Sequence, residues 1–302
     1  MARARWNNSQ ITGQAGRVVL ITGANSGLGK EAARVLALRN ARVIMAVRDT
    51  EKGRVVAEEI RDEYANAQIL VKKMDLASLE SVRQFAEEVL KEFERLDILI
   101  NNAGLMMCPY AKTEDGFEIQ MGINHLGHFA LTGLLLPLLI NTEGSRIVVT
   151  SSSAHNFGNI DFEDINWEKR KYNTQKAYGD SKLANLYFTY ELVRILDGMD
   201  GCPLVTAAHP GWTSTELQRH SKLFMFMNKI FGQDVETGTL PTLRAAVDPE
   251  AKPGDYYGPS RFFEMRGNPV KVNSNRRSHD EQRARQLWEI SEKLTGVKYK
   301  IN

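Results

Sequence analysis

The chain has 302 residues, of which 42% are hydrophobic and 25% are charged, as in an ordinary soluble globular protein. Its 39 basic and 37 acidic residues nearly balance, so the charge does not indicate a polyanionic partner such as a nucleic acid. The longest apolar stretch, residues 129–140, is too short to span a bilayer, and no apolar segment of a secretory signal follows the N-terminal arginines. With only two cysteines, these features predict a cytoplasmic protein without an integral membrane segment.

A buried strand is predicted at residues 18–21, followed by a glycine turn and a helix over residues 30–38. Free backbone N–H groups and the positive end of the helix dipole then converge on one point, where a pyrophosphate can bind. The glycines Gly23, Gly27 and Gly29 leave room for the turn and for close approach of the phosphate. The stretch therefore predicts a nucleotide site, although glycines alone would indicate only an ordinary strand–helix turn.

Strands and helices alternate along the rest of the chain. Further strands are predicted at residues 41–47, 68–74, 97–100, 146–150 and 204–208, with a short candidate at 256–257. Helices are predicted at residues 51–64, 78–89 with Ser78 as the cap, 114–139 and from about 178. The alternation predicts one α/β domain over residues 1–302, a doubly wound (Rossmann-type) parallel sheet with helices on both faces. Ligands then bind along the edge where the strands end.

Three segments of the second half receive separate predictions. Residues 156–172 are irregular and are expected to lie above the sheet. The helix near Tyr178 carries two apolar stripes, one for the sheet and one for a partner subunit in a homodimer or homotetramer. The second stripe consists of Ala184, Phe188, Leu192 and Ile195. Residues 213–233 are rich in Leu, Phe, Ile and Met and predict a lid over a lipophilic substrate, with a core helix or a membrane-interfacial helix as alternatives.

Several motifs occur in the order and spacing of one enzyme family. They are Thr22-Gly23-x-x-x-Gly27-x-Gly29, Asp75, Asn101-Asn102-Ala103-Gly104, Asn124, Ser152, Tyr178-x-x-x-Lys182 and Pro210-Gly211. Through them the chain resembles the short-chain dehydrogenase/reductase family over nearly its whole length. The segments 124–129, 181–185 and 209–211 are most similar to its retinol-dehydrogenase-like branch. The N-terminus is the one departure from that branch, since residues 1–10 are not expected to form the membrane anchor of several animal members.

The resemblance implies an oxidoreductase that transfers hydride between a nicotinamide and an alcohol, aldehyde or ketone. Tyr178 can protonate the substrate oxygen if its pKa falls well below the ordinary value of ~10. Lys182, one helical turn later, supplies a positive charge that favours the tyrosinate. Ser152 would hold the substrate oxygen, with its two serine neighbours as substitutes. Asn124 is implied to position a water that relays protons to the lysine.

The same resemblance implies a set of cofactor-binding residues. They are Gly23, Asn25, Ser26, Gly27, Leu28, Gly29, Arg48, Asp75, Leu76, Asn102, Ala103, Gly104, Tyr178, Lys182, Pro210, Gly211 and Thr213. Val47 occupies the position of the acid that binds the ribose hydroxyls in NAD-dependent relatives, and Arg48 follows it. This pattern favours NADP(H), with NAD(H) still open, because a guanidinium binds a 2′-phosphate. Asp49 is the rival acid but is expected to cap the next helix, and Arg48 as a solvated surface charge is the other alternative.

Two other functions remain open at this point, namely reduction of a conjugated C=C bond and a non-catalytic nucleotide-sensing regulator of the same fold. The presence of both Tyr178 and Lys182 argues against the regulator. No metal site is expected, because His125 and His128 have no cysteine or acidic partner at metal-ligand spacing and are predicted to pack in the core. His155 and His220 are candidates for substrate contact or for plain loop positions.

Overall fold

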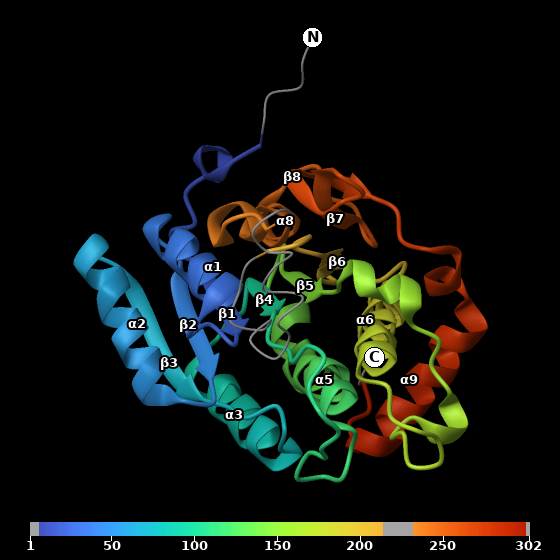
Figure 1. Cartoon of the computed structure of the whole chain (residues 1–302). Coiled ribbons are helices and arrows are strands. Elements are labelled where there is room, and N and C mark those ends of the chain that lie inside the picture. Colours follow the sequence, from blue (N-terminus) through green and yellow to red (C-terminus); the bar gives the residue numbers. More distant parts are fainter. Residues whose placement is uncertain (1–5, 214–231, 300–302) are drawn as a thin grey trace.

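The computed structural model describes residues 6–213 and 232–299 (Figure 1). Within these ranges one eight-stranded sheet has the order β3-β2-β1-β4-β5-β6-β7-β8. Its strands are β1 (Val18–Thr22), β2 (Arg42–Val47), β3 (Gln68–Lys73), β4 (Ile98–Asn101), β5 (Arg146–Thr150), β6 (Leu204–Ala208), β7 (Tyr256–Arg261) and β8 (Arg266–Val272). All neighbouring pairs are parallel except β7 and β8, which are antiparallel.

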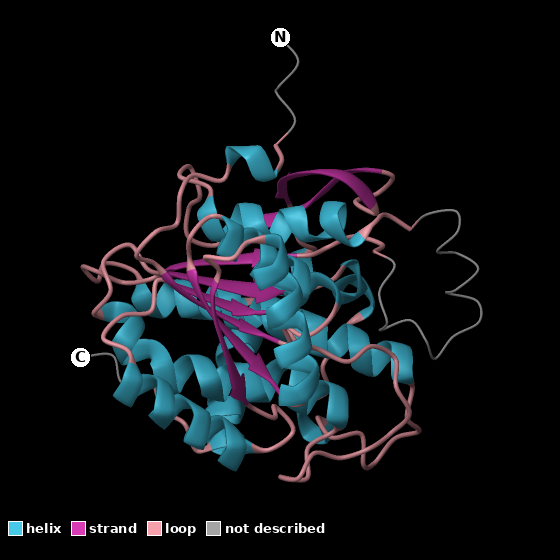
Figure 2. Cartoon of the chain, turned by 90° about the vertical axis from the view of Figure 1, so that its left-hand side faces the viewer, coloured by secondary structure: helices cyan, strands magenta, loops and turns pink. Residues whose placement is uncertain are grey.

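Helices cover both faces of the sheet (Figure 2). They are α1 (Gly27–Leu38), α2 (Thr50–Glu63), α3 (Leu79–Glu92), α4 (Ile119–Met121), α5 (Gly127–Ile140), α6 (Thr174–Leu196), α8 (Val235–Val247) and α9 (Glu281–Thr295). Helices α1, α2 and α8 pack in one hydrophobic core, and α3, α5, α6 and α9 pack in the other. The predicted doubly wound α/β fold is confirmed.

The central strands are apolar throughout because both of their faces are buried. In β1, Val18 and Leu20 enter the core on the α5 side, whereas Val19 and Ile21 enter the core on the α1 side. A parallel strand covered on both faces reads as an uninterrupted apolar run, which is why these strands could be predicted.

The helix predicted over residues 114–139 starts later than expected and is interrupted. Its first turn, α4, begins only at Ile119, because the Glu118 carboxylate caps it by accepting two backbone N–H groups. Residues 113–116 form a turn instead. The segment Gly122–Leu126 is a π-helix that joins α4 to α5 and places Asn124 at the irregularity.

Ser78 is the N-cap residue of α3, as predicted, but its side chain makes no capping hydrogen bond. The carboxylate of Asp115 accepts the Leu79 N–H at 2.9 Å instead. The capping hydrogen bond thus comes from a residue distant in sequence, which local spacing could not indicate.

Helix α9 covers the second apolar stripe of α6, so the predicted subunit interface on this stripe is wrong. Phe188 is stacked on Trp288 of α9, with ring centroids 5.9 Å apart and an interplanar angle of 19°. Phe129 and Tyr299 complete this aromatic cluster, and the Tyr299 hydroxyl donates to the Phe129 carbonyl at 2.8 Å. Leu192 of the stripe is fully buried as well. The chain itself therefore provides the partner for this stripe.

One helical stretch of the described residues, Ile119–Ile140, is long and apolar enough to cross a membrane by length and composition alone. Its mean hydropathy is 1.5, and 83% of its most apolar part is buried inside the protein. The core helix of a soluble protein passes the same test.

Candidate active site

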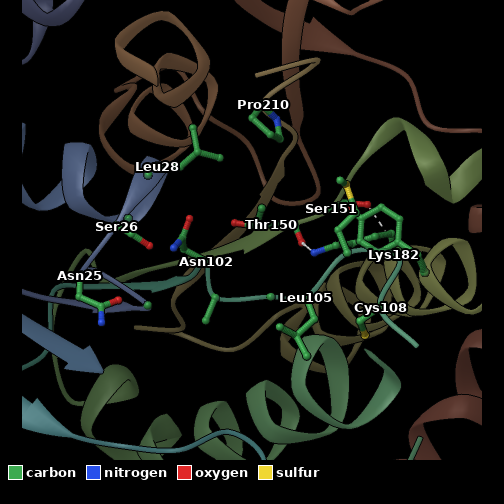
Figure 3. A pocket seen from close by; sticks show the side chains of 17 residues that line it. Asn25, Ser26, Leu28, Asn102, Leu105, Cys108, Thr150, Ser151, Lys182 and Pro210 are labelled. Atoms are coloured by element: carbon green, nitrogen blue, oxygen red, sulfur yellow. Dashed lines mark hydrogen bonds between the residues drawn. The ribbon is translucent and has the colours of Figure 1, made fainter. Parts of the chain in front are cut away.

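A pocket lies at the carboxyl ends of the central strands, where the parallel topology brings several loops together (Figure 3). Its lining residues are Gly23, Asn25, Ser26, Gly27, Leu28, Gly29, Asn102, Ala103, Gly104, Leu105, Met106, Cys108, Thr150, Ser151, Tyr178, Lys182 and Pro210. A neighbouring pocket shares six of these residues and continues toward the end of β2. It adds Ala46, Arg48, Asp49, Lys52, Met74, Asp75, Leu76 and Ile123. The two form one groove along the sheet edge, from Tyr178 to Arg48.

Most of the predicted cofactor residues line this groove, and two do not. Gly211 has a φ of +66°, and a Cβ there would lie 2.4 Å from the Met265 carbonyl oxygen, so this glycine serves the packing of the β7–β8 hairpin. The Thr213 hydroxyl donates to the Pro210 carbonyl at 2.9 Å and thereby holds a loop whose proline does line the pocket. The remainder of the predicted lid, residues 214–231, lies outside the described residues.

Close packing and backbone conformation require glycine at the positions of this turn. A Cβ at Gly29 would lie 2.4 Å from the Gly23 carbonyl oxygen and 2.6 Å from Asn102 Nδ2. Gly23 and Gly27 have φ values of +66° and +51°, which residues with a Cβ rarely adopt. Helix α1 begins at Gly27, so its positive end faces the groove, as predicted for a pyrophosphate site.

Thr22 holds the loops after β1 and β4 together, a role that the sequence did not predict. Its hydroxyl oxygen accepts the N–H groups of Asn102 and Ala103, both at 2.9 Å. The side-chain amide of Asn102 donates a hydrogen bond to the Thr22 carbonyl at 2.8 Å. The sequence feature that could have indicated this role is a threonine directly at the end of a buried strand, next to the glycine turn.

Tyr178 and Lys182 lie on α6, four residues apart and both buried. Lys182 Nζ lies 5.8 Å from the centre of the Tyr178 ring and donates to the Thr150 carbonyl at 3.1 Å. Burial lowers the pKa of Lys182 to about 8. Burial raises the pKa of Tyr178 to about 12, opposed in part by a hydrogen bond with Ser152. The expected lowering of the tyrosine pKa is therefore not found in the protein chain itself, because desolvation outweighs the other influences.

Of the three consecutive serines, Ser152 is the one that pairs with Tyr178. Its hydroxyl also accepts the Ala154 N–H at 3.2 Å, at the start of the short helix Ser153–Phe157. Ser151 lines the pocket, but its hydroxyl donates to the Lys182 carbonyl at 2.9 Å. Ser153 is exposed. Its influence on the pKa of Tyr178 thus favours the serine that the family resemblance implied.

Asn124 connects the loop after β4 to α6. Its amide nitrogen donates to the Leu105 carbonyl and to the Ser181 hydroxyl, both at 2.9 Å, and its amide oxygen accepts the Leu105 N–H at 2.7 Å. The side chain is fully buried and does not line the groove. It keeps Gly104 close to Lys182, since a Cβ on that glycine would lie 3.5 Å from the ammonium nitrogen.

At the far end of the groove the basic character predicted for the end of β2 is present. Arg48 is exposed and lines the groove together with Lys52. The Asp49 carboxylate accepts the Lys52 N–H at 3.0 Å and caps α2, as predicted. Val47 is buried, with a methyl group 2.9 Å from the position of a Cβ on Gly53. The Asp75 carboxylate accepts the Ala77 N–H at 2.9 Å.

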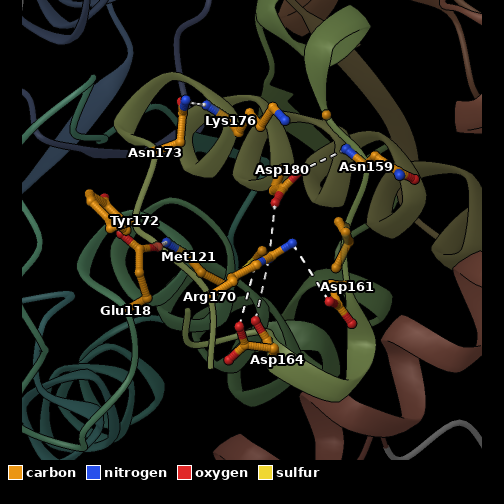
Figure 4. Close-up of polar contacts among 12 residues, drawn as sticks. Glu118, Met121, Asn159, Asp161, Asp164, Arg170, Tyr172, Asn173, Lys176 and Asp180 are labelled. Atoms are coloured by element: carbon orange, nitrogen blue, oxygen red, sulfur yellow. Dashed lines mark hydrogen bonds and ion pairs between the residues drawn. The ribbon is translucent and has the colours of Figure 1, made fainter. Parts of the chain in front are cut away.

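The segment between Ser152 and Tyr178, residues 156–172, is fastened to α6 by Arg170 (Figure 4). The Arg170 guanidinium approaches three carboxylates. They belong to Asp161 (3.7 Å), Asp164 (3.4 Å) and Asp180 (3.7 Å). Asp180, whose pKa burial raises to about 6, also accepts the Asn159 N–H at 2.7 Å. Because Asp180 is two residues from Tyr178, these contacts fix the chain after Ser152 beside the tyrosine.

His155 does not line the pocket and belongs to the short helix Ser153–Phe157. It is buried, its Nδ1 lies 2.7 Å from the Ser152 carbonyl oxygen, and its Nε2 accepts the Asn275 N–H at 3.2 Å. It therefore supports the backbone of Ser152 from behind. His220 lies outside the described residues. Cys108 borders the pocket and, like Cys202, is half-buried and free.

Comparison with known proteins gives concordant matches. Residues 17–224 match the family model described as short chain dehydrogenase. Retinol dehydrogenase 13 of Homo sapiens is 45% identical over 291 residues, which cover 93% of this chain and 85% of that protein. The crystal structure of an uncharacterised protein from Mycobacterium paratuberculosis has 43% identity and a TM-score of 0.83, and the match covers 99% of this chain and 100% of that chain. A short chain dehydrogenase of Shigella flexneri complexed with NADP has 28% identity and a TM-score of 0.64. That match covers 80% of this chain and 95% of the Shigella chain.

Proposed function

The chain belongs to the short-chain dehydrogenase/reductase family of NAD(P)-dependent oxidoreductases, and on that premise we propose that it interconverts a lipophilic alcohol and its aldehyde or ketone with NADP(H). One observation carries the proposed chemistry: Tyr178 and Lys182 line the pocket together, with the ammonium nitrogen 5.8 Å from the centre of the tyrosine ring, and Ser152 opposes the rise in the tyrosine pKa.

In the proposed reaction the nicotinamide supplies or accepts the hydride. Tyr178 donates its proton to the substrate oxygen during reduction and removes it during oxidation. Ser152 donates a hydrogen bond to the same oxygen and stabilises the charge that develops there. Lys182 stabilises the tyrosinate through its positive charge. Asn124 holds the loop after β4 against α6, so that cofactor and tyrosine keep a constant separation.

The lipophilic substrate is supported by two observations. Leu105, Met106 and Cys108 line the same pocket as Tyr178, and retinol, the substrate in the name of the human relative, is a lipophilic alcohol. Apolar lining with few polar groups is typical of sites for such ligands.

A substrate panel tests this function. NADPH consumption would be followed with aldehydes of increasing chain length, with ketones and with conjugated enones. The proposal expects kcat/KM to rise with the length of the apolar tail of the aldehydes. Turnover of enones by C=C reduction alone, or kcat/KM independent of tail length, would contradict it, and absence of turnover with bound NADPH would favour a regulator.

The cofactor preference depends on Arg48. Since hydrogen bonds to charged groups are worth about 1.5–3 kcal/mol, Arg48→Ala should lower kcat/KM for NADPH by roughly 10- to 100-fold and leave the value for NADH nearly unchanged. Arg48→Glu should reverse the preference. An acid at position 47 is a poorer test, because Val47 is buried and a charge there would destabilise the fold.

Arg54→Glu is the matched control, because Arg54 is exposed on α2 and outside the groove, and its substitution changes the net charge equally. Wild-type preference for NADH, or equal losses for both cofactors in Arg48→Ala, would refute the NADP(H) proposal.

A further inference from the structure

His128 connects two parts of the site that are distant in sequence. It is 2% exposed on α5, one turn after Asn124. Its Nε2 lies 2.8 Å from the Thr22 hydroxyl oxygen, and its Nδ1 lies 3.1 Å from the Asn124 carbonyl oxygen. The core-packing role expected from the sequence does not account for two short polar contacts, each to a residue of the site.

The hydrogen-bond network determines the tautomer of His128. The Thr22 hydroxyl oxygen already accepts two N–H groups, so its single hydrogen must be donated. His128 Nε2 at 2.8 Å is a closer acceptor than the Ile100 carbonyl at 3.5 Å. Nε2 is therefore unprotonated, and Nδ1 carries the hydrogen and donates it to the Asn124 carbonyl. Burial lowers the pKa of His128 to about 4, with a smaller contribution from the Lys182 charge, so the ring is neutral at physiological pH.

These contacts belong to a continuous series of buried hydrogen bonds. From His128 it passes to Asn124, whose amide donates to the Ser181 hydroxyl at 2.9 Å. The Ser181 hydroxyl in turn donates to the Tyr178 carbonyl at 2.8 Å. The loop that begins at Thr22 is thus linked, through His128, to the backbone of the tyrosine on α6.

We propose that His128 is a positioning residue that holds the nucleotide-binding loops and Asn124 in register with Tyr178. It orients the Thr22 hydroxyl toward itself, which leaves the oxygen lone pairs for the loop after β4, and it anchors the carbonyl at the π-helical irregularity. The proposal rests on the oxidoreductase activity but not on the choice of NADP(H) or of substrate. Only the register of the loops against the tyrosine is assigned to His128.

The first test compares His128→Phe with His125→Phe. Both replacements remove a buried imidazole from neighbouring turns of one helical stretch, but His125 contacts Ser291 of α9 at 2.8 Å, away from the groove. Displacements of about 1 Å in a site can cost 10²-fold, so His128→Phe should lower kcat by roughly 10- to 100-fold. His125→Phe should retain the wild-type kcat. Equal kcat values for the two variants would overturn the proposal.

The second test restores one contact at a time and also serves if His128→Phe does not fold. In His128→Asn the amide nitrogen replaces Nδ1 and can donate to Asn124, whereas in His128→Gln the amide oxygen replaces Nε2 and can accept from Thr22. Each should recover part of kcat relative to His128→Phe. Thr22→Val should lower kcat by a smaller factor in the His128→Asn background than in the wild type. The reason is that His128→Asn has already lost the contact with the Thr22 hydroxyl. Full additivity would contradict the link.

A third readout needs no turnover. The ¹⁵N chemical shifts of the His128 ring should show the Nδ1–H tautomer and no titration between pH 5 and 8. The Nε2–H tautomer, or titration near the ordinary histidine value of ~6.5, would overturn the proposal. If this signature is present and no substrate is turned over, the proposed function fails while the structural link stands.

Discussion

Replacing Tyr178 with phenylalanine is expected to lower turnover by about 10²- to 10⁴-fold while the fold and NADPH binding persist. The substitution removes only the hydroxyl group that would protonate the substrate oxygen, and the buried ring keeps its packing. The partner Ser152 is partly exposed, so water can replace the lost hydrogen bond. Steady-state kcat, together with NADPH affinity from fluorescence titration, would measure the two effects separately.

Tyr190→Phe is the matched control for this substitution. Tyr190 is also a buried tyrosine of α6. Its replacement by phenylalanine removes a comparable hydrogen bond, the one between the Tyr190 hydroxyl and the Ser274 hydroxyl at 2.7 Å. Near-normal turnover of Tyr178→Phe, or equal losses in both variants, would refute the assignment of Tyr178. With the tyrosine pKa raised by burial, the rate of alcohol oxidation should rise with pH up to pH 10, whereas aldehyde reduction should not.

Lys182→Met is expected to remove most of the activity and yet make the protein more stable at pH 7. Burial lowers the lysine pKa from 10.5 to about 8, a shift that corresponds to about 3 kcal/mol of unfavourable free energy for the buried charge. Below pH 8 the folded protein bears this cost in full, and it declines as the pH rises from 8 to 10.5. Methionine keeps the apolar stem without the charge.

The gain should be about 1–3 kcal/mol in the free energy of unfolding at pH 7, since the lost ammonium contact offsets part of the desolvation cost. The Thr150 carbonyl retains a hydrogen bond from Asn185 at 2.9 Å, so no buried acceptor is left unpaired. Urea unfolding at pH 7 and pH 10 would show the advantage shrinking with pH. Lys176→Met, an exposed position on the same helix, is the control, and a Lys182→Met protein less stable than wild type at pH 7 would disprove the argument.

Much of the sheet could be predicted because its central strands are buried on both faces and therefore read as apolar runs. The ends of these strands carry polar residues such as Asn102 and Ser151, which placed the groove at one edge. By contrast, β8 contains Gly267 and Pro269 and forms the antiparallel edge of the sheet, where burial imposes no such pattern.

The contacts that could not be predicted join residues far apart in the chain. An apolar stripe on α6 indicates burial but not the identity of its cover, so α9 could not be distinguished from a second subunit. Likewise, the spacing of His125 and His128 says that both face inward, but only the fold shows that one reaches Thr22 and the other α9. The start of α4 depended on the carboxylate of Glu118, which periodicity does not register.

The cover that α9 provides also constrains how this protein is made. The aromatic cluster joins Phe129 and Phe188 to Trp288 and Tyr299, so one core of the sheet is closed by residues translated long after the helices that they cover. During synthesis, the α6 stripe stays open to water until residue 299 has left the ribosome. We therefore expect the nascent chain to depend on chaperones over this interval, and premature termination before α9 to yield an aggregating product.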